Sequence, residues 1–276
     1  MPELPEVETV CRGMAPLIMG SRIVSVVQRK SSLRIPFPQG FSRSLAGRMV
    51  TEIERRAKYI LLTLDNGMVL LVHLGMSGTL VVSGYKDIQP GKHDHVIIHF
   101  KDGTILTYTD PRRFGLMTLV PKASIEQHRL LRKLGLEPLG RDFTGPVLES
   151  ALSGRKMAIK VALLDQTIVA GLGNIYACEA LYRAGISPRR LANSVKGLRA
   201  HRLAIAIRNV LNDAIHAGGS TLRDYVQSTG SIGYFQHEFS VYGCEHKPCP
   251  NCVCSTGVKR IVQGGRSTFF CSRHQR

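Results

Sequence analysis

The chain has 276 residues, enough for two domains or for one large domain with an appendage. Hydrophobic residues make up 43% of it and charged residues 21%, which is ordinary globular usage and excludes a mostly disordered or fibrous chain. Lysine and arginine number 37 against 20 for aspartate and glutamate, a formal net charge of +17. So basic a chain is expected to work on a polyanion, and nucleic acid is the default partner.

Three further features limit where the chain works. No apolar run approaches the roughly 18 residues of a membrane span, so we expect no membrane partner. The first eight residues, MPELPEVE, carry three glutamates and no lysine or arginine, the reverse of a signal or transit peptide, so a cytoplasmic location over the chromosome is predicted. Five of the seven cysteines fall in the last 33 residues, which indicates a metal site and not a disulfide scaffold.

The first half of the chain is predicted to be a short helix followed by strands. Pro5 suits a first helical turn, and Val7, Val10 and Met14 form one apolar stripe behind it. From residue 21 to 120, short β-rich runs alternate with turns. Asn-Gly and Asp-Gly turns at 65–67 and 101–103 are hairpin signals, so this half is predicted to be an antiparallel sandwich or barrel.

The second half has a helical period. It follows a Gly/Pro-rich stretch over 135–146 that is interpreted as a linker. Asn174 is predicted to cap a helix over 175–184 that stops at Gly185. Between residues 183 and 208 there are seven lysines or arginines and no acid, a density that favours phosphate contact over a merely solvated face.

The carboxyl-terminal cysteines have the spacing of a zinc site. Cys249 and Cys252 form a C-x2-C pair, followed after eighteen residues by Cys271 and His274, so three thiolates and one imidazole offer a closed tetrahedral ligand set. Cys244 or Cys254 could replace His274. Between the pairs, two β-rich runs flank a Gly-Gly turn with Arg266, which predicts a two-stranded zinc ribbon.

The amino terminus offers a nucleophile. Removal of the initiator methionine before Pro2 would expose a secondary amine, and an α-amino group with a pKa of about 7.7 to 8.0 is substantially unprotonated at neutral pH. Glu3 adjoins it and Glu6 lies one turn on. From composition alone, a simple role for Pro2 and Pro5 in shaping the helix entry is favoured over catalysis.

Read together, seven motifs occur in order across nearly the full length: MPELPEVET, RRAKYILL, HLGMSG, KHDHV, YTDPRRFG, GLGNIYACEAL and the terminal Cys pairs. The chain resembles formamidopyrimidine-DNA glycosylase, a bacterial glycosylase and AP lyase that removes oxidised purines such as 8-oxoguanine from duplex DNA. The resemblance implies an α+β multidomain protein with an N-terminal antiparallel β-sandwich and flanking helices, a helical helix-two-turn-helix module and a C-terminal zinc-ribbon finger. The expected bounds are 1–135, a linker over 136–149, 150–240 and 241–276.

The resemblance also implies catalytic roles. Pro2 is the nucleophile toward C1′ of the damaged nucleotide, and Glu3 matches the proton donor. Lys58 matches the residue for β-elimination, although a strand lysine is usually only a solvated charge or a phosphate clamp. Arg266 matches the donor for δ-elimination, and because a guanidinium is a poor acid it is better regarded as a phosphate and leaving-group stabiliser.

Residues for DNA contact follow from the same resemblance. Met76, Arg112 and Phe114 match the side chains that fill the gap left by an everted nucleotide. The segment from Ser228 to Gln236 matches the loop that closes over the everted base. Positions matching backbone-binding residues are His93, Arg155, Lys160, Asn174 and Tyr242.

Three departures and two alternatives accompany the resemblance. His274 stands where the family usually has a fourth cysteine, the gap between the pairs is longer than expected, and Cys244 and Cys254 are additional thiols. Zinc is therefore expected, while its fourth ligand stays open. A sister family removes oxidised pyrimidines with the same fold and nucleophile, but Leu4 stands where that family typically has glycine. A catalytically silent DNA-binding protein is the alternative of another class. A monomer is usual for the family.

Overall fold

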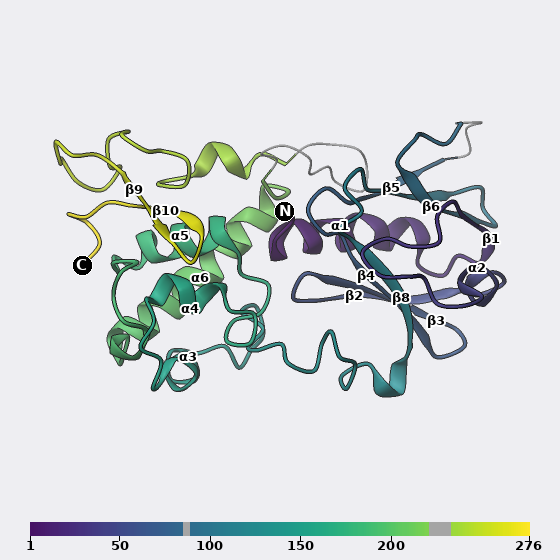
Figure 1. Ribbon diagram of the computed structural model, residues 1–276, viewed down its shortest axis with the longest axis horizontal. Coiled ribbons are helices and arrows are strands. Elements are labelled where there is room, and N and C mark those ends of the chain that lie inside the picture. The colour runs from purple at the N-terminus through teal and green to yellow at the C-terminus, as the bar shows by residue number, and fades with distance from the viewer. Residues whose placement is uncertain (85–88, 221–232) are drawn as a thin grey trace. The chain divides into compact units, whose positions relative to one another are not determined.

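The computed structural model describes residues 1–84, 89–220 and 233–276. The described residues form two compact units, the first from within 1–132 and 217–236 and the second from within 133–216 and 237–276 (Figure 1). No helix among the described residues is long and apolar enough to cross a membrane. The predicted α+β fold with antiparallel sheets is confirmed. The division into four segments at 135, 149 and 240 stays a prediction.

The first unit is built around two antiparallel sheets of four strands each. Their strand orders are β1-β6-β7-β5 and β2-β3-β4-β8. Two short helical segments accompany them, α2 (Phe41–Leu45) and η1 (Lys122–Ser124). The strands are β1 (Ile23–Gln28), β2 (Val50–Arg56), β3 (Tyr59–Leu64), β4 (Met68–His73), β5 (Thr79–Ser83), β6 (Asp94–Phe100), β7 (Ile105–Thr109) and β8 (Leu116–Pro121).

Both predicted hairpin turns are present. Residues 65–67 join β3 to β4 and residues 101–103 join β6 to β7, with Gly67 and Gly103 at φ of 75° and 86°. Only glycine takes this left-handed conformation at little steric cost, so the two turns fix the registers of both pairs. Buried aliphatic side chains from the two sheets then form one core.

Helix α1 (Leu4–Ile18) packs on this core and carries the amino terminus. The predicted apolar stripe is correct, because Val7, Val10 and Met14 have no exposed surface. Contacts of α1 with β2, β3 and β5 bury that stripe. Burying three such side chains stabilises the unit by roughly 1.5 to 3 kcal/mol each, so the position of the first residues is set by the core behind them.

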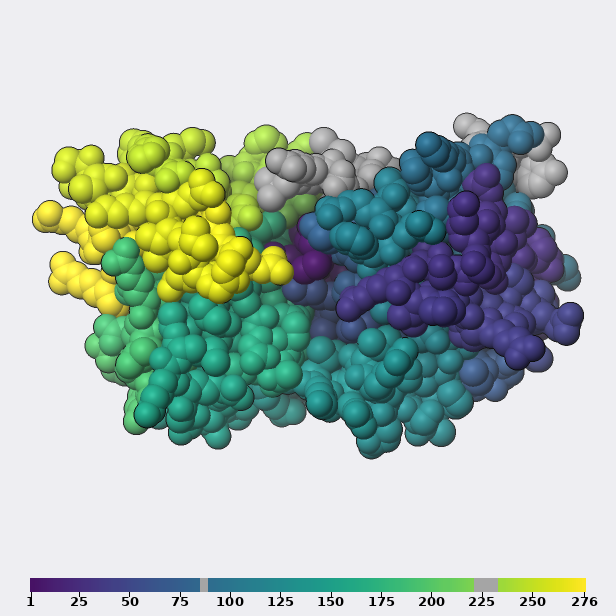
Figure 2. All heavy atoms as spheres, viewed as in Figure 1, coloured from purple at the N-terminus to yellow at the C-terminus, as the bar shows by residue number. Residues whose placement is uncertain are grey.

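The second unit is mainly helical. Figure 2 shows its last residues, in yellow, gathered on one face over the helical residues in green. Within it β10 contacts α5, so the carboxyl-terminal ribbon is held against the helices. Its elements are α3 (Gly145–Leu152), α4 (Ile159–Leu164), α5 (Asn174–Arg183), η2 (Ala192–Ser194), α6 (Leu198–His216), β9 (Lys259–Gln263) and β10 (Arg266–Phe270), with η3 (Phe235–Glu238) at the boundary between the units.

Two expectations for this half are corrected. Helix α3 begins at Gly145, inside the predicted linker, because Pro146 fits a first helical turn and Gly145 packs closely on His201, where a Cβ would lie 2.7 Å from the His201 Cα. Asn174 is the first residue of α5 and not its cap, since Gly173 holds the cap position. The Asn174 side chain instead donates to the Ser267 carbonyl on β10 at 2.9 Å.

Candidate active site and metal centre

The residues next to the amino terminus are buried and held by a carboxylate pair. Pro2 is buried, and Glu3 is only 4% exposed. The Glu3 backbone N–H donates to Oε2 of Glu6 at 2.8 Å, and the Glu3 side chain accepts from the backbone of Glu6 in return. This capping box satisfies two groups at the start of α1. It fixes the Glu3 carboxyl beside Pro2.

Glu6 also makes a long-range contact that the sequence did not reveal. Its other oxygen, Oε1, accepts from the backbone N–H of Ser220 at 2.9 Å and from the Ser220 hydroxyl at 3.0 Å. Ser220 in turn pairs with Tyr234. Glu6 thus joins the first turn of α1 to a segment more than 200 residues later. Of the loop predicted at 228–236, residues 228–232 lie outside the described residues.

Lys58 lies on the tight turn between β2 and β3. Arg56 pairs with Tyr59, and Ala57 takes the left-handed φ of 54°. Lys58 is 7% exposed, so it is not the solvated charge that a strand lysine usually is. Because the turn is only two residues long, its backbone has little freedom to move.

Arg55 ties this turn to α1. Its guanidinium donates to Glu8 at 2.8 Å and to the Ala57 carbonyl at 3.0 Å, with its side chain 6% exposed. Burial alone would raise the pKa of Glu8, but hydrogen bonds and charges from Arg12 and Arg55 outweigh it and lower that pKa. The ionised carboxylate therefore holds the turn that carries Lys58 against the helix that carries Glu3.

His73 lies near Lys58 and was not predicted from the sequence to belong to the site. Burial, then the charges of Lys58 and Arg34, lower the pKa of His73 to about 4, so its ring is neutral at pH 7. Nδ1 accepts the backbone N–H of Gly75 at 3.0 Å. The ring therefore supports the loop that follows β4, which contains Met76.

The loops after β4 and β7 present the side chains predicted to fill a gap in DNA. Met76 is 37% exposed and Phe114 46%, so neither side chain is part of the buried core. Arg112 is also exposed, and its Cζ lies 4.7 Å from the centre of the Phe114 ring. His93, predicted to bind the DNA backbone, is half-buried near the start of β6.

The DNA-binding residues predicted in the second unit differ in how far their side chains are exposed. Arg155 is half-buried and donates to the Ala151 carbonyl at 2.9 Å. Lys160 in α4 has no exposed surface. Arg266 is exposed at the start of β10, directly after the Gly264–Gly265 turn, as predicted. Asn174 holds that strand through Ser267.

Tyr242 is positioned by a buried acid. Glu179 on α5 is 1% exposed, and its Oε1 accepts the backbone N–H groups of Val241 and Tyr242 at 2.9 and 2.8 Å. Its Oε2 accepts from Ser240 at 3.0 Å. The sequence signal was a lone glutamate in an otherwise apolar stretch of helix, which indicates a buried acceptor.

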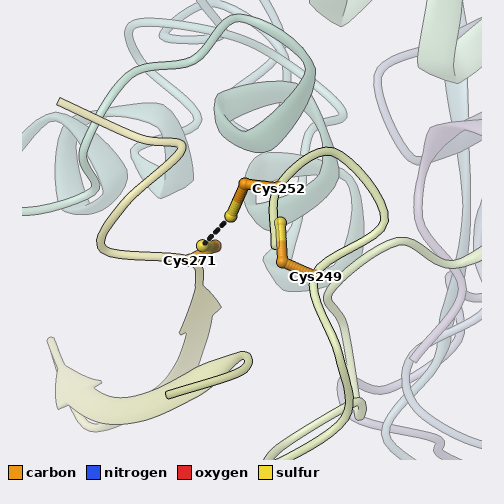
Figure 3. Close-up of side chains that lie close together, drawn as sticks. All are labelled: Cys249, Cys252 and Cys271. Atoms are coloured by element: carbon orange, nitrogen blue, oxygen red, sulfur yellow. Dashed lines mark hydrogen bonds between the residues drawn. The ribbon is translucent and has the colours of Figure 1, made fainter. Parts of the chain in front are cut away.

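Three cysteines converge in the carboxyl-terminal segment. Their sulfurs, from Cys249, Cys252 and Cys271, all lie within 4.8 Å of one another, and Figure 3 shows Cys252 and Cys271 pointing toward each other. The Cys252 and Cys271 sulfurs are 3.5 Å apart. That is close to the edge of about 3.8 Å that four sulfurs make around zinc at about 2.3 Å, and far from a disulfide. The donor set fits a zinc ion.

Cys254 is better placed than His274 to complete this set. The Cys254 sulfur lies 3.6 Å from that of Cys271. The imidazole of His274 instead places Nε2 at 3.1 Å from the Tyr182 carbonyl and packs on the Tyr182 ring at 4.7 Å. Cys244 faces the carbonyls of Phe239 and Tyr242. The structure thus favours Cys254 as the fourth ligand, where the spacing had favoured His274.

Comparison with known proteins accounts for nearly the whole chain. The family model for the formamidopyrimidine-DNA glycosylase N-terminal domain matches residues 1–117, and the model for the H2TH domain of that enzyme matches 134–226. The chain belongs to the formamidopyrimidine-DNA glycosylase family. Curated relatives with that name from Rhodospirillum centenum and Beijerinckia indica are 54% and 51% identical, each over 100% of both chains.

Solved structures agree with this membership. The MutM (Fpg) protein of Thermus thermophilus superposes with a TM-score of 0.87 at 40% identity, covering 99% of this chain and 98% of that one. Lactococcus lactis Fpg in complex with DNA containing N7-benzyl-Fapy-dG has a TM-score of 0.90 at 34% identity over the full length of both chains. Pro2, Glu3 and Lys58 all fall within the N-terminal family match.

Proposed function

We propose that the chain is a bifunctional DNA glycosylase and AP lyase that removes oxidised purines, 8-oxoguanine and formamidopyrimidines, from duplex DNA. The observation that carries this proposal is the match to relatives named formamidopyrimidine-DNA glycosylase along the entire chain. The solved complex of a relative with Fapy-dG-containing DNA supports the substrate class. The formal charge of +17 supports a nucleic acid partner.

In the proposed mechanism, the nitrogen of Pro2 is the nucleophile once Met1 has been removed. Its lone pair attacks C1′, the bond from C1′ to the damaged base breaks, and the base leaves with that electron pair. The sugar ring opens with a proton supplied to its ring oxygen, and the secondary amine gives an iminium directly. Glu3, buried beside Pro2 and capped by Glu6, is assigned as the proton donor.

The iminium then accepts electrons during strand cleavage. Loss of the C2′ proton expels the 3′ phosphate, and a second elimination expels the 5′ phosphate to leave a one-nucleotide gap. Lys58 is assigned to the first elimination, for which its burial on a tight turn is suitable. Arg266, exposed after the ribbon turn, is assigned to stabilise the departing phosphate of the second.

Chemistry at C1′ requires the nucleotide to leave the base stack. Met76 and Phe114 are proposed to fill the gap, with Arg112 facing the orphaned base. Phosphate positioning is assigned to His93, Arg155, Asn174 and Tyr242, which fixes register without reading sequence. Lys160 was predicted to join them, but it has no exposed surface and is not assigned to phosphate contact.

One structural zinc ion is proposed in the second unit, held by Cys249, Cys252, Cys271 and Cys254. With four thiolates the site has no open position, so the metal would supply folding energy and no catalysis. We also propose that the protein acts as a monomer in the bacterial cytoplasm, on chromosomal DNA.

Incision of matched duplexes tests the function. The substrates carry 8-oxoguanine opposite cytosine, thymine glycol, or no lesion. We expect incision of the first, much less of the second and none of the third, together with a covalent adduct trapped by borohydride on the first. A chain extended by an N-terminal tag is the matched control, and it should bind the same duplex without forming an adduct.

Each alternative has its own outcome in this experiment. Preferred incision of thymine glycol would assign the chain to oxidised pyrimidines. Binding without incision or trapping would make it a DNA-binding protein that lacks catalysis. Undiminished trapping by the tagged chain would move the nucleophile to a lysine, and Lys58 would be the first to replace.

A further inference from the structure

A buried aspartate is hydrogen-bonded to both of the loops that follow β4 and β7. Asp110 has no exposed surface. Its Oδ1 accepts the Ser77 hydroxyl at 2.7 Å, and its Oδ2 accepts the Tyr108 hydroxyl at 3.1 Å and the Gly115 backbone N–H at 2.9 Å. The backbone N–H of Arg112 donates to Oδ1 of Asp110 and to the Ser77 hydroxyl oxygen, with its nitrogen 3.3 Å from each. A carboxylate with this many donors is well satisfied without solvent.

The backbone of Asp110 adds a third segment to this junction. Its N–H donates to the His93 carbonyl at 3.0 Å, and its carbonyl lies 2.8 Å from Nε2 of His95. His95 is 3% exposed. One residue therefore joins the loop containing Met76, the loop containing Arg112 and the start of β6.

The two loops also pack closely against each other at Gly75 and Gly115. A Cβ on Gly75 would lie 2.4 Å from the backbone of Phe114 and Gly115, and a Cβ on Gly115 would lie 1.8 Å from the Tyr108 hydroxyl. Neither position accepts a side chain without movement of the atoms opposite. Above this close contact, Met76, Arg112 and Phe114 are exposed, while Asp110 and Gly115 on either side of the second loop are buried.

We infer that Asp110, through Ser77, Tyr108 and the Gly115 N–H, is a positioning residue that holds Met76, Arg112 and Phe114 as one preformed wedge for nucleotide eversion. This inference rests on the proposed function. A wedge that is rigid before DNA arrives loses little conformational freedom on insertion, so more of the contact energy is available to open the base stack. Asp110 touches neither the nucleophile nor DNA in this account, and its effect is confined to the eversion step.

The test replaces Asp110 by asparagine in the full-length, zinc-loaded protein. An asparagine side chain has the same shape as that of aspartate, but its amide NH₂ replaces one acceptor oxygen. At least one of the hydroxyl or N–H donors that bond Asp110 is then left without an acceptor. We expect single-turnover incision of an 8-oxoguanine duplex to slow about tenfold to a hundredfold. Cleavage of a single-stranded oligonucleotide with an abasic aldehyde, which needs no eversion, should stay within about threefold of the unaltered protein.

Asp102→Asn is the matched control, because Asp102 is an exposed turn aspartate at the other end of β7. It should leave both rates unchanged. Tyr108→Phe and Ser77→Ala each remove one donor and should slow duplex incision less than Asp110→Asn, with the abasic single strand again spared.

Three further measurements separate positioning from general destabilisation. Fluorescence of 2-aminopurine placed next to the lesion should show slower stack opening with Asp110→Asn, and a duplex with a mismatch beside the lesion should restore much of the rate. In a Phe114→Ala background, Asp110→Asn should add little further loss, since both changes disable the same wedge.

Equal losses on duplex and abasic single strand, or full additivity with Phe114→Ala, would overturn the inference, as would unchanged duplex incision. If the unaltered protein cleaves the abasic strand but no lesion duplex, the proposed glycosylase function fails and the inference fails with it. If it incises both and Asp110→Asn does so equally well, only the inference fails.

Discussion

His73 shows how a single buried ring makes the N-terminal unit sensitive to acid. Its pKa is about 4 in the folded chain because of burial and the charges of Lys58 and Arg34, against an ordinary value of 6.5. Between these values the unfolded chain binds a proton that the folded chain does not, so stability is fully present above pH 6.5 and is lost as pH falls toward 4. The loss amounts to at most about 3 kcal/mol.

His73→Asn should remove this dependence. The asparagine amide oxygen can replace Nδ1 as the acceptor for Gly75, and the amide does not titrate. We expect the difference in unfolding free energy between variant and unaltered protein to shift in favour of the variant as pH is lowered from about 7 to about 4.5. Denaturant titrations at several pH values measure it, and parallel pH profiles for the two proteins would contradict the assignment.

A second prediction at this scale concerns the fourth zinc ligand. Because the Cys254 sulfur is 3.6 Å from that of Cys271 while His274 is occupied with the Tyr182 carbonyl, Cys254→Ser should lose zinc. His274→Ala and Cys244→Ser should retain one ion per chain. Metal content measured on the purified variants decides it, and zinc lost from His274→Ala but kept by Cys254→Ser would restore the ligand set expected from spacing.

At the scale of elements, the β9–β10 ribbon presents Arg266 directly after its glycine turn. Arg266→Ala should leave removal of the base and the first elimination nearly intact while slowing the second about tenfold or more, because a departing phosphate loses its charge-assisted partner. Gel analysis of the 3′ ends would then show β-elimination product accumulating. Arg260→Ala, on the paired strand, is the control, and equal effects of the two variants would mean a general loss of positive charge.

Elements defined by local signals were predictable from the sequence, and those defined by distant partners were not. The Asn66-Gly67 turn, the apolar stripe of α1 and the ribbon hairpin each depend on neighbouring residues, and all three are confirmed. Asn174 has a good local cap signal, yet its side chain bonds Ser267, 93 residues away. No local pattern could show this competition.

The same reason explains which parts of the candidate site were missed. Pro2, Glu3 and Lys58 were selected by resemblance, whereas Asp110 and Glu179 act only through tertiary hydrogen bonds. Asp110 reaches Ser77, 33 residues away, and Glu179 reaches Val241, 62 residues away. A sequence shows that such carboxylates exist, but only the packing shows which donors they meet.

At the scale of the whole molecule, the folding of the first unit should not depend on the metal bound in the second. Removing zinc with a chelator should unfold the ribbon, which has few buried apolar residues, while the two sheets of the first unit stay folded. Proteolysis should then cut within residues 244–276 and spare 1–132. Cooperative loss of both units on chelation, seen as complete loss of sheet signal in circular dichroism, would contradict this independence.

The hydrogen bonds between Glu6 and Ser220 bear on the order in which the chain folds during synthesis. The Glu6 carboxylate can bond Ser220 only after a further 214 residues have been synthesised. Tyr234, which pairs with Ser220, also belongs to the first unit. The amino-terminal segment leaves the ribosome first, but its tertiary contacts are therefore among the last to form. Residues 133–216 separate the two parts of that unit, which at about 5 to 20 residues per second is a delay of roughly 4 to 17 seconds. During that interval the nascent amino terminus exists without the partner that fixes Glu6, so a growing chain carries Pro2, the proposed nucleophile, well before it can form the finished site.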